Sequence, residues 1–324
     1  MKTNWEHASG AREIAKPQLE KMIASAFPEQ KLLLAERTGT GLSSGTYKIR
    51  LEHADIPYLL RISAGHADVA LMERAITERI DANIPVARYL HLDTSGSIFP
   101  QPWAILEWKE GVLLRDLLQS SDNQIIADAA TAVGTVLARI HQYEFASHGF
   151  LAPDLHIAHT LEMGADGFLS FITDSLKTEQ AVQWLDKAEQ KALWDFCLLH
   201  ALLLSDTVET PILVHSDFNG LNVLMRQDSN GIQVAAVLDW EFAFSGSRYV
   251  DIGNMLRYEE EQSLYEQHFI EAYRQAGGQL DEQWRLLSRL QELIALLDML
   301  SHSTASMPVR IADLQQLIAR TISL

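Results

Sequence analysis

The sequence predicts a two-lobed α+β fold, with a small N-terminal lobe built on an antiparallel sheet and a larger, mostly helical C-terminal lobe. Two observations support this prediction. The first hundred residues contain short β-like runs with one helix between them, whereas nearly everything after Gly111 has a helical period. The length of 324 residues also fits a two-lobed unit better than one small domain.

In the N-terminal lobe, a first helix is expected over residues 17–27. Strands are expected over 31–37, 46–52 and 58–63, each bounded by turn-forming residues. Asp68 begins a helix whose apolar residues recur every three or four positions up to Ile80, before Asn83 and Pro85 end it. Two further strands near 86–92 and 103–108 complete the predicted sheet.

The sequence Lys109-Glu110-Gly111 breaks the strand pattern and places a hinge over 107–111. The predicted lobes are therefore residues 1–106, which bind nucleotide, and 112–324, which hold the catalytic and substrate site. Helices are expected over 123–143, over 178–204 and from Tyr249 to the end. An irregular connection over 147–171 and a β island over 212–214, 223–225 and 234–238 lie between them.

Composition narrows the classes of partner. Lysine and arginine total 26 against 43 aspartates and glutamates, a formal charge of −17, which has the wrong sign for binding a phosphate backbone. No apolar run is long enough to span a bilayer. We therefore expect no nucleic acid, no membrane and a cytoplasmic location, with the oligomeric state open. The single cysteine, Cys197, is expected to be a buried helix thiol.

One loop carries the strongest chemical signal. The pattern His215-x-Asp217-x-x-x-x-Asn222 follows an apolar strand, and Asp239 ends the apolar strand that comes after it. Phosphoryl transfer needs oxygen ligands for Mg²⁺ and a carboxylate that receives the attacking hydroxyl. We therefore expect Asp217 to be the catalytic base and Asn222 and Asp239 to bind Mg²⁺. His215 is expected to be structural, donating to a backbone carbonyl.

The N-terminal lobe offers matching residues for a nucleotide. The turn Gly39-Thr-Gly41-Leu-Ser43-Ser44-Gly45 lies between two strands, where backbone amides and small hydroxyls can approach phosphates. Gly41, Ser43 and Ser44 are the candidates, although an ordinary hairpin loop would have the same composition. Arg61 on the third strand is expected to anchor phosphates. Its acidic partner is Glu73, with Glu78 as the alternative.

These segments together resemble the aminoglycoside phosphotransferase family, which is related to choline kinase and other small-molecule kinases of the protein-kinase-like fold. The most specific parts are the 215–222 loop and Val237-Leu-Asp-Trp-Glu-Phe-Ala243 through Asp251-Ile-Gly253. The resemblance implies ATP or GTP as co-substrate, Mg²⁺, and adenine binding along 106–108, including Glu107 and Trp108. It also implies that Asp251 steadies the loop. Arg61 stands where the family often has lysine.

The expected acceptor is a hydroxyl group of a small molecule. Asp239-Trp240-Glu241 stands where protein kinases have Asp-Phe-Gly, and no Ala-Pro-Glu segment follows, so protein substrates are not expected. An aminoglycoside-like or other amine-bearing acceptor fits the acidic composition. The run Glu259-Glu260-Glu261 could attract such an amine, or be a solvated helix end.

Two other interpretations stay open at this point. The fold could bind nucleotide and regulate a partner without transferring phosphate. Alternatively, His148, Asp154, His156 and His159 could form the metal site of a hydrolase, although their spacing matches no recognised ligand motif. Turnover with a panel of acceptors would distinguish a phosphotransferase from a nucleotide-binding regulator. Metal analysis of the purified protein would distinguish a phosphotransferase from a metal-dependent hydrolase.

Overall fold

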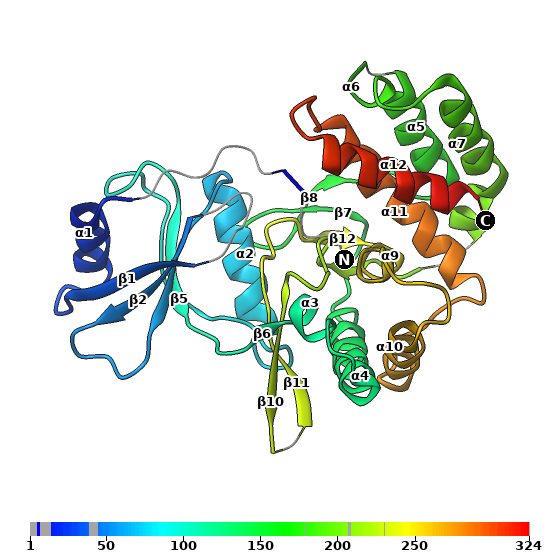
Figure 1. Cartoon of the computed structure of the whole chain (residues 1–324). Coiled ribbons are helices and arrows are strands. Elements are labelled where there is room, and N and C mark those ends of the chain that lie inside the picture. The colour runs from blue at the N-terminus through cyan, green and yellow to red at the C-terminus, as the bar shows by residue number, and fades with distance from the viewer. Residues whose placement is uncertain are drawn as a thin grey trace.

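The N-terminal lobe is an antiparallel sheet with strand order β1-β2-β3-β5-β4, at the left of Figure 1. It is seen in a computed structural model that describes residues 5–6, 14–38, 45–177, 179–206, 209–229 and 231–323. The strands are β1 (Leu32–Thr38), β2 (Gly45–Leu51), β3 (Tyr58–Ile62), β4 (Tyr89–Asp93) and β5 (Trp103–Glu107). Helix α1 (Lys16–Ala26) precedes β1, and α2 (Ala67–Ile80) connects β3 to β4. The predicted sheet and its helix are thus confirmed.

The fourth strand begins later than the expected residue 86. Residues 84–86 run against the other lobe instead, where the carbonyl of Pro85 accepts a hydrogen bond from the Val237 N–H at 2.8 Å. Ile84 and Val86 are buried there. Local periodicity reports an extended apolar segment but does not say which sheet it joins, and this is the source of the difference.

Helix α2 ties the two lobes together. Its buried residues Met72, Ile76 and Ile80 belong to the core of the helical lobe, together with Leu114 and Val237. The sheet has a separate core under α1. Because α2 is fixed against the helical lobe, it holds Glu73 at the boundary between the lobes.

The C-terminal lobe combines helices with two small sheets, ordered β11-β10-β6 and β8-β7-β12-β9. Its strands are β6 (Val112–Leu113), β7 (Gly149–Leu151), β8 (Ile157–Thr160), β9 (Ile212–Val214), β10 (Val223–Asp228), β11 (Gly231–Val237) and β12 (Phe244–Gly246). Its helices are α3 (Leu114–Leu117), α4 (Asn123–Ile140), α5 (Gly164–Lys177), α6 (Glu179–Val182), α7 (Lys187–His200), α8 (Leu202–Asp206), α9 (Tyr249–Leu256), α10 (Leu264–Gln275), α11 (Trp284–Ser301) and α12 (Pro308–Ile322).

Two predictions about this lobe were wrong. The helix expected over 178–204 is three helices, because Asp186 caps α7 by accepting from the N–H groups of Ala188 and Glu189. The irregular connection expected over 147–171 contains β7, β8 and the start of α5. Strand β7 pairs with β12, almost a hundred residues later, and local periodicity cannot reveal such a partner.

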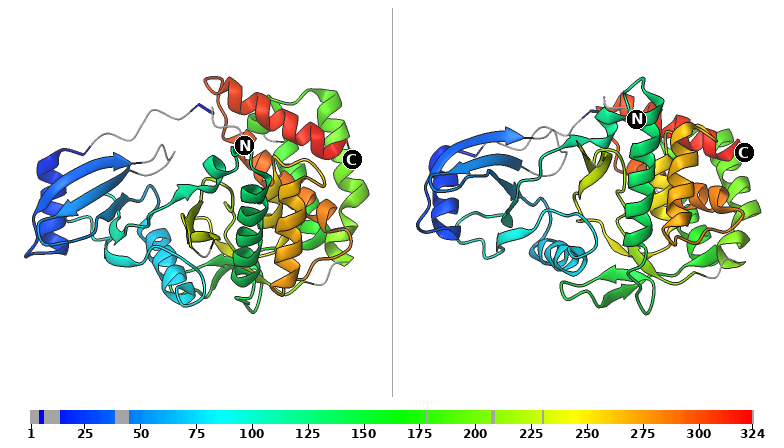
Figure 2. Two further views of the ribbon diagram at one scale, coloured as in Figure 1. Left: turned by 60° about the horizontal axis from the view of Figure 1, so that its bottom comes forward. Right: turned by 90° about the horizontal axis from the view of Figure 1, so that it is seen from below.

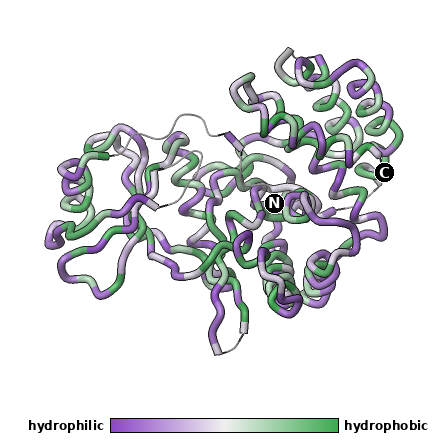
Figure 3. The backbone as a smooth tube through the Cα atoms, viewed as in Figure 1, coloured by the Kyte–Doolittle hydropathy of each residue, from purple (hydrophilic) through white to green (hydrophobic). Residues whose placement is uncertain are grey.

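Close helix packing completes the lobe. Helices α4 and α10 lie side by side (Figure 2), and a Cβ on Gly134 would collide with the carbonyl oxygen of Phe269. Cys197 is buried in α7 as expected, and burial raises the pKa of its thiol to about 12. The β10 arm of the β10–β11 hairpin becomes hydrophilic away from the lobe (Figure 3), whereas both arms are apolar where they join it. Of the helices described, none has the length and apolar character to cross a membrane.

Candidate active site

The candidate catalytic loop leaves β9 at His215 and enters β10 at Val223. Both oxygens of the Asp217 carboxylate accept side-chain hydrogen bonds within this loop. Asn219 Nδ2 donates to Oδ1 at 2.7 Å, and Asn222 Nδ2 donates to Oδ2 at 2.7 Å. The structure therefore brings Asp217 and Asn222 together. Burial raises the pKa of Asp217, although nearby His215 and Arg257 act to lower it.

Asp251 fixes the start of this loop through two hydrogen bonds to its backbone. Its carboxylate accepts from the backbone N–H of His215 at 2.9 Å and from that of Ser216 at 2.8 Å. Ser216 has a φ of 69°, a conformation that costs energy for a residue with a Cβ and persists because its surroundings fix it. This geometry agrees with the steadying role that the family resemblance implies for Asp251.

A buried histidine supports Asp251 in turn. His141 Nε2 lies 3.2 Å from the Asp251 carboxylate, and His141 Nδ1 lies 2.8 Å from the Tyr273 hydroxyl. Burial lowers the pKa of His141 more than Asp251 raises it, so the ring is neutral at pH 7. The neutral ring donates to Asp251 through Nε2 and accepts from Tyr273 through Nδ1.

His215 has the structural role expected of it. Its Nε2 donates to the carbonyl of Leu238 at 2.8 Å, and its Nδ1 accepts from the Asp217 N–H at 3.2 Å. The ring is fully buried against Trp240. His215 thereby fixes the distance between the catalytic loop and the end of β11, where Asp239 lies.

Arg61 connects the sheet lobe with the metal-binding candidate. Its guanidinium lies 2.5 Å from Glu73, 2.5 Å from Asp239 and 3.8 Å from Glu241. Although burial alone would lower it, Glu73 and Asp239 raise the pKa of Arg61, so its charge is permanent. Glu78 pairs with Arg74 instead, at 2.7 Å. Of the two acidic candidates, the structure places Glu73 beside Arg61.

The residues expected to bind adenine lie where the chain leaves the sheet. Glu107 ends β5, and its carboxylate lies 2.8 Å from Lys109 and 3.2 Å from Arg88. Although burial acts to raise it, Lys109 and Arg88 lower the pKa of Glu107. Trp108 donates through Nε1 to Glu110 at 2.7 Å, beneath the ammonium of Lys48. The glycine-rich turn candidates Gly41, Ser43 and Ser44 lie outside the described residues, so their role stays a prediction.

The side-chain oxygens of Asn222 and Asp239 suit a hard cation as ligands. The Asn222 side chain donates from Nδ2 to the backbone and the side chain of Asp217, whereas within the described residues its Oδ1 accepts no hydrogen bond. Asp239 presents a partly exposed carboxylate at a backbone φ of 64°. Carboxylate and amide oxygens are the ligands that Mg²⁺ prefers, and nucleotide phosphates supply the others.

The histidine cluster does not form a metal site within the described part of the chain. No three His, Cys, Asp or Glu side chains gather there closely enough to hold an ion. Asp154 contacts His156, with both side chains largely exposed. His148 lies apart with a buried Nδ1 and a pKa lowered by burial. The structure thus gives no support to the hydrolase interpretation.

A cavity of about 760 Å³ opens beside Asp217. It extends from the catalytic loop between β7, α5 and α11, and it is the natural place for an acceptor. The acidic run Glu259-Glu260-Glu261 does not line it. Glu260 and Glu261 instead lie 3.9 Å and 4.0 Å from arginines of neighbouring helices, and Glu259 accepts from Ser263.

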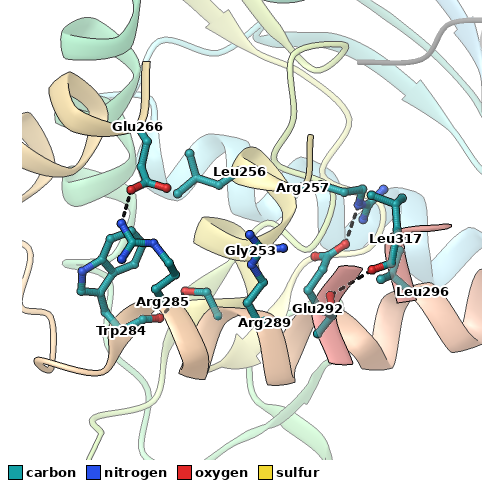
Figure 4. Close-up of a pocket in the computed structure, with 12 residues that line it drawn as sticks. Gly253, Leu256, Arg257, Glu266, Trp284, Arg285, Arg289, Glu292, Leu296 and Leu317 are labelled. Atoms are coloured by element: carbon teal, nitrogen blue, oxygen red, sulfur yellow. Dashed lines mark hydrogen bonds and ion pairs between the residues drawn. The ribbon is translucent and has the colours of Figure 1, made fainter. Parts of the chain in front are cut away.

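Sequence reasoning missed both cationic residues that line this cavity in the described chain, Arg257 and Arg310, and Arg257 is the one nearer the catalytic loop in sequence. Figure 4 shows the guanidinium of Arg257 beside the Glu292 carboxylate. The two groups lie 2.5 Å apart, and Arg257 lines both the small pocket of Figure 4 and the cavity. In the amide orientation that satisfies both its atoms, Asn254 accepts from Arg257 at 2.8 Å and donates to the Phe218 carbonyl at 3.1 Å. Polar residues at positions 251, 254 and 257 of an otherwise apolar segment were the signal that could have revealed it.

The architecture is that of a kinase-like protein, with a sheet lobe, a helical lobe and the catalytic loop at their junction. Similar solved structures are aminoglycoside phosphotransferases. APH(4)-Ia has a TM-score of 0.71 at 19% identity, over 95% of this chain and 99% of that chain. A GDP complex of an aminoglycoside 2'-phosphotransferase IIIa mutant has a TM-score of 0.74 at 14% identity, over 95% and 98%. At these identities the likeness establishes the fold.

The family follows from the sequence comparison. The family model described as "Phosphotransferase enzyme family" matches residues 35–293, and this chain belongs to that family. A curated relative, "Acyl-CoA dehydrogenase family member 10" of Mus musculus, is 27% identical over 227 residues, or 65% of this chain. The match spans only 19% of that relative. The chain thus has a kinase-like fold and belongs to the phosphotransferase enzyme family.

Proposed function

We propose that this protein transfers the γ-phosphoryl group of ATP or GTP to a hydroxyl of a small molecule, in a Mg²⁺-dependent reaction. The observation that carries the proposal is the convergence of Asp217 and Asn222 in one hydrogen-bonded loop, with Asp239 bound to Arg61 at the lobe boundary. Similar structures of other proteins, solved in complex with ADP and hygromycin B and with GDP and kanamycin, support nucleotide and small-molecule binding.

In the proposed reaction, Asp217 orients the acceptor hydroxyl and receives its proton. A bond forms between the acceptor oxygen and the γ-phosphorus while the bond from that phosphorus to the bridging oxygen breaks, which releases the nucleoside diphosphate. Asn219 and Asn222 hold the Asp217 carboxylate in position through Nδ2. The loop therefore pre-positions the base before the acceptor arrives.

Asn222 and Asp239 would hold Mg²⁺, which when bound neutralises charge on the phosphates. Arg61 supplies a permanent cation that lies 2.5 Å from Asp239 and holds its carboxylate in place. Residues Glu107 and Trp108, together with the turn that contains Gly41, Ser43 and Ser44, are proposed to bind the nucleotide.

The test is turnover with Mg–ATP and Mg–GTP across a panel of hydroxylated acceptors, followed by nucleoside diphosphate release and mass spectrometry of the product. We expect Asp217→Asn to lower kcat by about 10²-fold or more while nucleotide affinity stays the same. The matched control is Asp174→Asn, which changes an exposed aspartate at the end of α5. If Mg–nucleotide binds but no acceptor is phosphorylated, the protein is a nucleotide-binding regulator instead.

A further inference from the structure

The cavity beside Asp217 is apolar in composition. Of its 26 lining residues, 15 are apolar or aromatic, two are glycine, four are polar and uncharged, and five are charged. Phenylalanines come from three separate elements of the fold, including Phe168 of α5 and Phe244 of β12. An apolar lining of this kind favours ligands that leave water for hydrophobic contact.

The apolar character continues to the cavity's mouth. Phe150, Leu221 and Phe242 line the cavity with 52%, 42% and 59% of their side-chain surfaces exposed. Phe150 packs against Phe244 at 6.1 Å between ring centroids, and Leu221 belongs to the catalytic loop itself. Large apolar side chains that are exposed to solvent beside one cavity indicate a binding site for an apolar group.

The charges of the cavity do not suit a polycation. Apart from Asp217, its acidic residues are Glu162 and Asp298, which are both exposed, and two arginines balance them. Arg257 is paired with Glu292, whereas Arg310 stacks on Trp5 and has a buried Nε with no hydrogen bond in the described chain. Binding several ammonium groups out of water requires matching carboxylates, and this cavity lacks them among its described lining.

One buried polar side chain remains for ligand recognition. Gln291 of α11 lines the cavity with 8% of its surface exposed, and it has no hydrogen-bond partner among the residues described. Its amide faces the cavity and is available to hydrogen-bond with a ligand. A polar group of a bound ligand would satisfy it.

From this lining we infer that the acceptor is an apolar alcohol, in which a hydrocarbon body bears the reacting hydroxyl, and not a polycationic aminosugar. The inference rests on the proposed phosphotransfer function, since it assigns Asp217 to the hydroxyl. The hydrocarbon body lies against the phenylalanines of β7, α5 and β12, and Gln291 receives a polar substituent. The acceptor class thus departs from the antibiotics named in the similar structures.

Calorimetric titration without nucleotide tests the binding step directly. The probes are 1-hexanol, 1-heptanol, 1-octanol and 1-nonanol, with kanamycin and hygromycin B as the cationic comparison. We expect affinity to rise about fourfold for each added methylene and the heat-capacity change of binding to be negative. Tighter binding of kanamycin or hygromycin B than of 1-octanol, or alcohol affinity independent of chain length, would overturn the inference.

Matched variants locate the binding to this cavity. Phe242→Ser removes an exposed aromatic ring from the mouth, and we expect it to weaken 1-octanol binding about fivefold or more. Leu199→Ser removes a leucine of α7 that is more exposed than Phe242 and does not line the cavity, and we expect no change. Equal losses in both variants would place the alcohol elsewhere and refute the assignment.

Turnover separates this inference from the proposed function. With Mg–ATP or Mg–GTP, a phosphorylated alcohol supports both. If an aminosugar is phosphorylated and the alcohols are neither bound nor phosphorylated, the phosphotransfer function is supported and the inference of an apolar acceptor is refuted. If the alcohols bind with the expected dependence on chain length but no product forms, the apolar binding site is supported and phosphoryl transfer to these alcohols is refuted.

Discussion

The guanidinium of Arg61 lies 2.5 Å from the carboxylate of Asp239, which links the sheet lobe to the end of β11. The same guanidinium binds Glu73 on α2, so one cation joins three elements. A nucleotide phosphate that approached Arg61 would meet a cation already fixed in place, and Asp239 would meet its metal at a fixed distance from that cation.

Removing Arg61 should destabilise the fold, because it leaves the buried Glu73 carboxylate without its cation. We expect Arg61→Ala to lower the free energy of unfolding by about 3 kcal/mol in urea denaturation. The matched control is Arg74→Ala, which removes the exposed pair with Glu78 and should cost less than about 0.5 kcal/mol. Equal losses of unfolding free energy in the two variants would show that the buried pair with Glu73 stabilises the fold no more than the exposed pair does.

The two asparagines of the catalytic loop should respond differently to Mg²⁺. Asn222→Ala removes a proposed metal ligand, so the Mg²⁺ concentration for half-maximal rate should rise at least about tenfold. Asn219→Ala removes the hydrogen bond to the other Asp217 oxygen, and it should lower kcat without changing the Mg²⁺ dependence. Titration of the rate with Mg²⁺ at saturating nucleotide makes the comparison. An identical Mg²⁺ dependence would exclude Asn222 as a ligand.

The rate should depend on pH through Asp217. Burial disfavours the charged carboxylate and raises its pKa above the ordinary aspartate value. A catalytic base must be ionised, so kcat/KM should fall as the pH falls through that raised pKa, before an exposed aspartate would protonate. A plot of log kcat/KM against pH should have a slope of one on its acid side. Unfolding temperatures at each pH exclude acid denaturation, and a flat profile down to pH 4 would contradict the assignment.

How much the sequence reveals depends on the range of the interaction. The loop residues Asp217 and Asn222 are five positions apart, and their kinase-loop spacing between two apolar strands predicts that they act together. Arg61 and Asp239 are 178 positions apart, and their contact follows only once α2 is packed against the helical lobe. Sequence pattern and family resemblance predicted Arg61 and Asp239 as site residues, but only the structure shows how far apart they lie.

The acceptor cavity illustrates what the sequence could not provide. Phe150, Leu221 and Phe242 are unremarkable as single apolar residues, because scattered exposed apolar side chains are normal. They become a site only because β7 pairs with β12 across the lobe, a pairing that no local pattern contains. Likewise, the acidic run at 259–261 suggested an amine site, and tertiary packing places it beside arginines outside the cavity.

The support of the catalytic loop by Asp251 should matter for turnover more than for nucleotide binding. In Asp251→Asn, one of the two oxygens that accept from the His215 and Ser216 N–H groups becomes an amino group. A buried N–H then loses its acceptor, which should cost about 2 kcal/mol of unfolding free energy. The loop would also lose its fixed geometry, so kcat should fall, while nucleotide affinity, set around Arg61, should change little.

The control for Asp251 has the same chemistry away from the site. Asp122 accepts from the Gln124 N–H at 2.8 Å to cap α4, and Asp122→Asn should cost no more than about 1 kcal/mol with kcat unchanged. Urea denaturation, kcat and calorimetric nucleotide affinity are measured for both variants. An unchanged kcat in Asp251→Asn would mean that the loop holds its shape without Asp251. The strained φ of Ser216 argues otherwise, since a left-handed serine persists only where its N–H is fixed by a partner.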